Sequence, residues 1–263
     1  LRACRPGKTA IAPDSVFRYS SVPLNESMPE TVAAPRKCCM PPLSKSIAAR
    51  LPVEWQLTLK RLLYARQIRR GTFATDEPEF DRLADWIRPG DWVLDVGANV
   101  GHYTTRFSEL GGARGRVIAF EPIPATFSLL AANARLFPHA NVTLINAAAS
   151  DQTRLAGMAI PRFDSGLANY YEAHVAPHSA PDLAVLTLAI DSLALDQRIA
   201  LVKIDAEDHE SAVLAGMSRL IERDRPVLIV ETGSRDVANR LESAGYTAEK
   251  LPGSPNLLFR PRT

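Results

Sequence analysis

Short apolar runs alternate with longer amphipathic stretches from residue 92 to the end of the chain. The apolar runs predict buried strands, and the stretches between them predict helices. Because strands and helices alternate, we expect an α/β fold with a mostly parallel, seven-stranded sheet and helices on both faces. The predicted strands cover 92–96, 116–120, 142–146, 184–189, 200–204, 226–231 and 256–260, and the predicted helices cover 101–110, 124–137, 209–222 and 234–244.

The first 90 residues have a different pattern. Residues 1–50 are rich in proline and serine, which interrupt both helix and sheet, so we expect a disordered basic arm. Over 51–70, leucines mix with lysines and arginines, which predicts a basic amphipathic helix, and a second helix is expected over 77–88. The sequence therefore predicts an arm over 1–50, a helical extension packed on the core over 51–90 and a main domain over 91–263.

The formal net charge of +2 conceals an asymmetry along the chain. Residues 1–70 hold 13 Lys and Arg against 4 Asp and Glu, whereas the rest holds 18 against 25. The basic stretch is either a solvated arm or a surface that contacts an anionic partner. Aromatic residues do not interleave with these charges as they do in nucleic-acid grooves, so we expect no nucleic-acid partner.

Composition is ordinary for a globular protein, with 46% hydrophobic and 23% charged residues. No apolar run approaches the ~20 residues that span a bilayer, and the N-terminus lacks the apolar segment of a secretory signal. Cys4, Cys38 and Cys39 match neither a disulfide framework nor a zinc site. We therefore expect reduced thiols, a cytoplasmic protein and no stable membrane insertion.

The segment over 93–101 is the most informative motif. Val93, Leu94 and Val96 suit a buried strand, and Asp95, Gly97, Asn99 and Gly101 then alternate through a turn into a helix. The glycines allow a ligand to approach the backbone, and the helix start offers free amides. A carboxylate at the centre of the turn is unsuited to phosphate and suits a cationic, hydroxyl-rich ligand. S-adenosylmethionine, which has an amino group, a sulfonium and a ribose, fits these features.

Two further strand ends fit the same ligand. Glu121 follows the second strand, 20 positions beyond Gly101, where a carboxylate can accept hydrogen bonds from both ribose hydroxyls. The third strand ends at Asn146 and Ala147, whose neighbourhood of small residues either leaves room for adenine or simply forms a tight turn.

The fourth motif is Lys203-Ile-Asp-Ala-Glu-Asp-His-Glu210, where charged side chains crowd the end of a strand. Burying such charges is costly, which favours a functional site at Asp205 and Glu207. His209 is a base, a substrate contact or a structural residue, and Asp208 suits a helix N-terminus. Asp205 and Glu207 could hold a divalent metal, because hard cations take carboxylates, but the sequence offers no complete ligand set, so we do not predict one.

Two other features extend the candidate site. Glu231 places a further carboxylate at the end of the next strand, where it lines the pocket or only caps the strand. The segment over 161–182 is long, polar and aromatic, and it is either a lid over the site or a solvated loop.

These motifs together resemble the FkbM family of S-adenosylmethionine-dependent methyltransferases. The matching segments span about residues 78–235 and include Asp95-Val-Gly-Ala-Asn-Val-Gly-His-Tyr-Thr, Phe120-Glu-Pro122, Asn146-Ala-Ala-Ala-Ser-Asp151, Leu188-Ala-Ile-Asp-Ser-Leu193, Lys203–Glu210 and Val230-Glu231. The chain departs from the family in having Asp208 where glycine is usual and His102 where tyrosine is common.

The resemblance implies a Rossmann-like class I methyltransferase that methylates a hydroxyl oxygen, with sugars and polyketide-type natural products as known family acceptors. It implies that the cofactor contacts come from Asp95, Gly97, Ala98, Asn99, Gly101, Tyr103, Glu121, Pro122, Asn146, Ala147 and Asp205, and that Asp205, Glu207 and His209 serve catalysis.

Two alternatives stay open. One is a methyltransferase-like module that binds the cofactor without turnover, which the extra charge of Asp208 would favour. The other is a nicotinamide-dependent dehydrogenase, which shares the strand–helix rhythm. A dehydrogenase would carry Gly-x-Gly-x-x-Gly after the first strand, where this chain has Asp95-x-Gly97-x-Asn99-x-Gly101.

Overall fold

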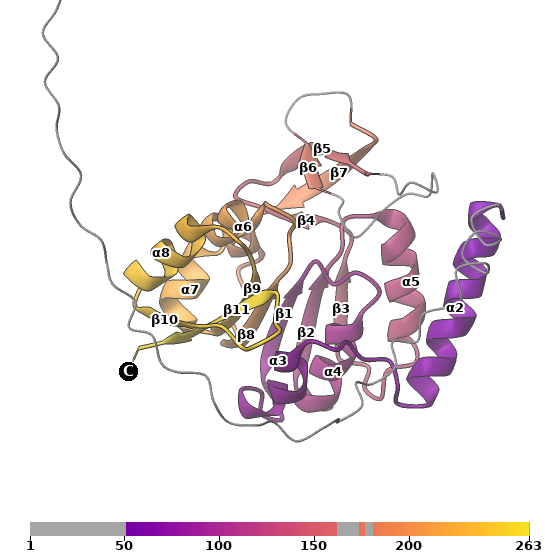
Figure 1. The fold of residues 1–263 in the computed structure, drawn as a ribbon, viewed down its shortest axis with the longest axis horizontal. Helices are drawn as coiled ribbons and strands as arrows, with labels where there is room; N and C mark the ends of the chain where they lie inside the picture. The colour runs from indigo at the N-terminus through magenta and orange to yellow at the C-terminus, as the bar shows by residue number, and fades with distance from the viewer. Residues whose placement is uncertain (1–50, 162–173, 177–180, 263) are drawn as a thin grey trace, which may run out of the picture. The chain divides into compact units, whose positions relative to one another are not determined.

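A computed structural model describes residues 51–161, 174–176 and 181–262 of the chain (Figure 1). The expected arm over 1–50 lies outside the described residues. All the described elements fall within one compact unit, Pro41–Thr263. In the part of the chain that the structure describes, no helix is long and apolar enough to cross a membrane.

The unit is built on a seven-stranded sheet in the order β10-β11-β9-β8-β1-β2-β3. Strand β11 is antiparallel to both of its neighbours, and the other adjacent pairs are parallel. The strands are β1 Trp92–Val96, β2 Arg116–Phe120, β3 Val142–Ile145, β8 Ile199–Ile204, β9 Val227–Glu231, β10 Tyr246–Glu249 and β11 Asn256–Pro261. The expectation of a mostly parallel sheet with helices on both faces is confirmed.

Helices cover both faces of this sheet (Figure 1). Alternate residues of β1 serve opposite faces, since Leu94 packs with helices α6, α7 and α8, whereas Val93 packs with α3 and α4. All six residues of β8 are buried, as expected of a central parallel strand. The helices are α3 Pro78–Arg82, α4 His102–Gly111, α5 Pro124–Ala134, α6 Glu210–Gly216, α7 Ser218–Asp224 and α8 Arg235–Ser243.

A second, four-stranded sheet in the order β4-β7-β5-β6 was not expected. Its strands are β4 Ala148–Ala149, β5 Arg154–Ala159, β6 His174–Ala176 and β7 Leu183–Leu188. The placement of 184–189 in the main sheet is therefore wrong, because β7 pairs with β5 and β4. The alternating buried and exposed residues of β7 are typical of a sheet with one solvent-exposed face. The seventh strand of the main sheet is β10, whose Tyr-Thr-Ala-Glu sequence gives little apolar signal.

Other boundaries also differ from those expected. The helix predicted over 209–222 is divided into α6 and α7 at Met217, and the helix predicted over 77–88 is the short α3 followed by a 3-10 turn, Leu83–Asp85. Helix α2, Val53–Arg69, packs beside α5 (Figure 1). Its side chains do not form the single apolar face expected, because leucines also lie on its exposed side.

Candidate functional site

A cavity of about 310 Å³ lies at the carboxyl ends of the central strands, between the main sheet and the four-stranded sheet. This is where parallel α/β sheets bind their ligands. The residues that line it are Glu77, Val96, Gly97, Asn99, Phe120, Glu121, Pro122, Ile123, Ala147, Ala148, Ala149, Met158, His174, Val175, Asp205, Ala206, Glu207, His209 and Glu231. Five of these residues are carboxylic acids, and none of the described lining residues is lysine or arginine.

The turn after β1 forms one wall. The amides of Gly97 and Ala98 donate to Phe120 O at 3.0 and 2.8 Å, which holds the turn against β2. Gly97 has φ +78°, and a Cβ on it would lie 1.8 Å from the carbonyl oxygen of Asp205. Only glycine therefore lets the turn pass this close to the end of β8.

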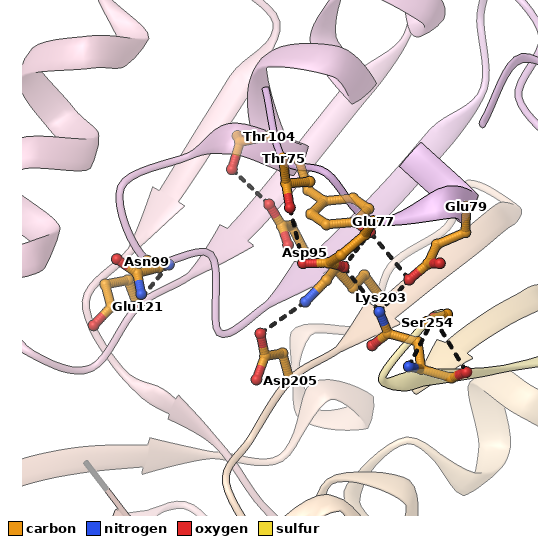
Figure 2. Close-up of polar contacts among 12 residues, drawn as sticks. Thr75, Glu77, Glu79, Asp95, Asn99, Thr104, Glu121, Lys203, Asp205 and Ser254 are labelled. Atoms are coloured by element: carbon orange, nitrogen blue, oxygen red, sulfur yellow. Dashed lines mark hydrogen bonds and ion pairs between the residues drawn. The ribbon is translucent and has the colours of Figure 1, made fainter. Parts of the chain in front are cut away.

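Asp95, in β1, does not line the cavity and is instead hydrogen-bonded to α4. Its Oδ2 accepts a hydrogen bond of 2.5 Å from Thr104 Oγ1 on α4, and its Oδ1 is buried without a hydrogen-bond partner (Figure 2). Burial raises the pKa of this carboxyl to about 6, although the nearby charge of Lys203 opposes the rise.

Glu121 is held in the cavity wall by two backbone amides. Its Oε2 accepts from the Asn99 amide and its Oε1 from the Ile123 amide, both at 2.9 Å. Burial raises the pKa of Glu121 to about 7, and these two amides oppose the rise. Figure 2 shows Glu121 beside Asn99, across the turn from Asp205.

The predicted adenine side of the cavity is small and apolar. Ala147, Ala148, Ile123 and Met158 line it, three of them from the segment around β4 and β5. Asn146 does not line the cavity. Its Nδ2 donates to the carbonyl oxygens of Glu121 and Pro122 at 2.8 and 3.1 Å. The side chain of Asn146 therefore ties together the two loops that border the apolar wall.

Lys203 is a buried lysine that lies among the carboxylates of Asp205, Asp95 and Glu77. Lys203 Nζ lies 2.9 Å from Asp205 Oδ2 and 4.8 Å from the centre of the Tyr103 ring. Burial alone would lower the pKa of Lys203, but the carboxylates of Asp205, Asp95 and Glu77 outweigh it and raise that pKa. This ammonium is the internal counter-ion of the site.

Glu77 is a cavity residue that sequence reasoning missed. It accepts hydrogen bonds from Tyr103 Oη at 2.6 Å, Asn256 Nδ2 at 2.8 Å and Thr75 Oγ1 at 3.1 Å (Figure 2). Burial opposes its ionisation, but these donors and Lys203 lower its pKa. The only local signal was a glutamate before Pro78 at a helix start, and nothing local links it to Asn256.

The turn from β8 into α6 carries the remaining predicted residues. Glu207 and Asp208 have φ values of +45° and +67°, so both occupy the left-handed region. Glu207 lines the cavity, whereas Asp208 is exposed and does not. The left-handed conformation explains why glycine suits position 208, and the charge of Asp208 lies outside the cavity lining.

His209 lines the cavity from the N-cap of α6. Its Nε2 lies 2.9 Å from the hydroxyl of Ser150, which also donates to Asp151 Oδ1 at 3.0 Å. Burial lowers the pKa of His209, so the neutral imidazole is favoured. Ser150 was quoted in the resemblance without a role, and this contact could not be predicted across 59 positions.

The structure brings most of the predicted site together. Gly97, Asn99, Glu121, Pro122, Ala147, Asp205, Glu207 and His209 line the cavity, and Asp95, Ala98, Gly101, Tyr103 and Asn146 do not. Tyr103 instead packs between Phe80 and Phe107, with ring centres 5.3 and 5.6 Å away. Gly101, at φ +98°, starts α4 where a Cβ would meet Leu130.

The second sheet supplies part of the segment predicted as a lid. His174 and Val175 of β6 line the cavity. Residues 162–173 and 177–180 of that segment lie outside the described residues. Among the residues that are described, no group of three or more His, Cys, Asp or Glu is arranged to hold a metal ion.

The strand order, with one antiparallel strand near an edge and the cavity at the carboxyl ends of the parallel strands, defines a class I methyltransferase fold. Residues 95–247 match the Methyltransferase FkbM domain, and the chain belongs to this family. A comparison with curated proteins gives no match.

Three solved structures illustrate the likeness. Methyltransferase FkbM from Methylobacillus flagellatus is 18% identical with a TM-score of 0.49, and the match covers 83% of this chain but only 58% of that one. An rRNA methylase from Streptococcus thermophilus is 11% identical with a TM-score of 0.42, and the match covers 69% and 93%. Fibrillarin from Aeropyrum pernix, with natively bound S-adenosyl-L-methionine, is 14% identical with a TM-score of 0.42 and coverage of 66% and 67%.

Proposed function

We propose that the protein transfers a methyl group from S-adenosylmethionine to a hydroxyl group of a sugar or natural-product acceptor. The acidic cavity carries this proposal, since five carboxylic acids line it and the buried Lys203 is already paired with one of them, Asp205. Such a lining favours a ligand with an ammonium and a sulfonium. It disfavours the pyrophosphate of a nicotinamide cofactor, which argues against the dehydrogenase alternative.

The cavity residues divide into three roles toward the cofactor. Glu121, fixed by two backbone amides, would accept the ribose hydroxyls, and the apolar wall at Ala147 and Met158 would hold adenine. Asp205 and the turn at Gly97 would hold the methionine end. Asp95, Tyr103 and Asn146 would support these groups without touching the cofactor, which revises their predicted role.

When bound, S-adenosylmethionine supplies an electrophilic methyl group. The residues at the β8 end need to align an acceptor hydroxyl with it, exclude water and take up a proton, and alignment alone is worth about 7–11 kcal/mol. His209 is our candidate base, because its lowered pKa favours the neutral imidazole. If the Ser150 hydroxyl donates to Asp151, Nε2 carries the ring hydrogen, and Nδ1 is left to accept a proton.

Two observations argue against a module that binds the cofactor without turning it over. The side chain of Asp208, which motivated that alternative, is exposed and outside the cavity lining. His209, Asp205 and Glu207 all line the same cavity, as a site that handles a proton requires.

The test is methyl transfer from labelled S-adenosylmethionine to a panel of glycans and hydroxylated natural products, with RNA included. We expect label on a hydroxylated small molecule, and His209→Ala and Asp205→Ala should lower single-turnover transfer by roughly 10²-fold or more. His139→Ala and Asp236→Ala, outside the cavity lining, are the matched controls. Label on RNA would contradict the proposed acceptor class, and unchanged transfer in both site variants would contradict the catalytic assignment.

A further inference from the structure

Helix α2 carries apolar side chains on two opposite faces. Leu57, Tyr64 and Ile68, spaced seven and four residues apart, form the inner face and pack with Phe73 and Leu129. Through this cluster α2 packs beside α5 (Figure 1). The apolar residues on the other side of the helix are not needed for this packing.

The outer face of α2 consists of Trp55, Leu59 and Leu62, spaced four and three residues apart, so they share one side of the helix. Their exposed fractions are 64%, 48% and 65%, and Leu63 beside them is 43% exposed. A single exposed leucine is ordinary, but a contiguous row that includes a tryptophan marks an interaction surface.

Arginines continue this outer face toward the end of the helix. Arg66 follows Leu62 on the same side, and Arg69 and Arg70 flank it, all three exposed. Glu54 is the only acidic residue in α2. A partner that complements the outer face must therefore offer both an apolar layer and negative charge.

The chain's own N-terminal segment does not meet this requirement. Residues 1–50 contain 8 Lys and Arg against 3 Asp and Glu, so they have the same sign of charge as the arginines of α2. A second copy of α2 packed in parallel would likewise bring arginines together, and one packed antiparallel would offer the arginines only Glu54, the one acidic residue of α2. An interfacial helix on an anionic bilayer has the observed combination of tryptophan, leucines and arginines.

We propose that the outer face of α2, defined by Trp55, Leu59, Leu62 and Arg66, docks the protein onto an anionic lipid surface. Trp55 and the leucines enter the boundary between headgroups and acyl chains, and the arginines contact lipid phosphates. The helix lies in the plane of the surface and keeps its inner face on the core. This docking is independent of the methyltransferase proposal.

The experiment is flotation of the full chain with vesicles of phosphatidylcholine alone and of phosphatidylcholine mixed with phosphatidylglycerol. We expect binding only to the anionic vesicles, and weaker binding as salt rises. Each arginine near the surface contributes a factor of about five to the partition coefficient, so Arg66→Gln with Arg69→Gln should lower it about 25-fold. Trp55→Ala with Leu62→Ala should lower it at least roughly tenfold.

Matched controls come from exposed residues elsewhere. Arg114→Gln with Arg235→Gln repeats the charge change, Leu186→Ala repeats a leucine truncation, and both should bind as the parent does. Unchanged thermal unfolding of the α2 variants separates lost binding from misfolding. The proposal is overturned if the parent binds neither vesicle, if the α2 variants bind equally well, or if light scattering shows a dimer that Leu62→Ala converts to a monomer.

Discussion

At the scale of single residues, Asp208 occupies a backbone conformation that favours glycine. Aspartate adopts its φ of +67° at a small cost in free energy, because a short polar side chain can hydrogen-bond to nearby backbone. Alanine cannot form such a bond, so the same conformation costs more free energy for alanine. We predict that Asp208→Gly raises the free energy of unfolding by about 0.5 kcal/mol and that Asp208→Ala lowers it. Denaturant unfolding of both variants checks this, and a gain in Asp208→Ala would show that charge rather than backbone conformation matters.

Glu121 should matter for binding more than for any other step. Its carboxylate fixes the Asn99 and Ile123 amides and lies in the cavity wall. A charge-assisted hydrogen bond is worth about 1.5–3 kcal/mol, so the loss of even one ribose contact in Glu121→Ala should weaken binding of S-adenosylmethionine at least roughly 10- to 100-fold. Glu109→Ala, an exposed glutamate on α4, is the control for titration calorimetry. Equal affinity of the Glu121→Ala variant and the parent would contradict the ribose assignment.

At the scale of elements, the contact between the β1 turn and the end of β8 depends on the absence of one side chain. Both Gly97 and Gly90 have positive φ, but a Cβ on Gly97 meets Asp205 O at 1.8 Å and one on Gly90 meets nothing within 4 Å. We therefore predict that Gly97→Ala costs at least about 2 kcal/mol more than Gly90→Ala. Chemical denaturation measures both. Equal costs would mean that the turn can move away from β8.

The elements that could be predicted from the sequence are those whose pattern is local. Buried parallel strands such as β1 and β8 appear as apolar runs, and the charged residues that end them mark the cavity edge. Strand β10 and the four-stranded sheet were not predicted from the sequence, because their strands are short or half-exposed. The sequence predicted which residues end the strands, but not that β7 would pair away from the main sheet.

The site residues that could be predicted from the sequence are likewise those with a local signal. Asp205 and Glu121 follow strands directly, so their convergence at one sheet edge could be inferred from topology. Glu77 could not be placed, because it reaches the cavity through hydrogen bonds to Tyr103 and to Asn256, 179 positions away. No sequence pattern records such a distant pair.

At the scale of the whole molecule, the acidic cavity makes ligand affinity depend on pH. Glu121 in the free protein has a pKa of about 7, and hydrogen bonds from ribose hydroxyls favour its ionised form. Binding therefore releases a proton below pH 7, and affinity for S-adenosylmethionine should rise about tenfold between pH 6 and pH 8. Calorimetry in buffers of different ionisation enthalpy detects that proton. Glu121→Gln should bind more weakly and lose the slope, and an unchanged slope would assign the titration to another group.

The acidic cavity should select its ligand by charge. Isothermal titration of the full chain with S-adenosylmethionine, S-adenosylhomocysteine and NAD compares the three ligands in the same buffer. We predict that the two adenosyl amino acids bind at one site per chain and that NAD does not, because its pyrophosphate would enter a cavity lined by five carboxylic acids and by no described lysine or arginine. Binding of NAD without binding of S-adenosylmethionine would contradict the account.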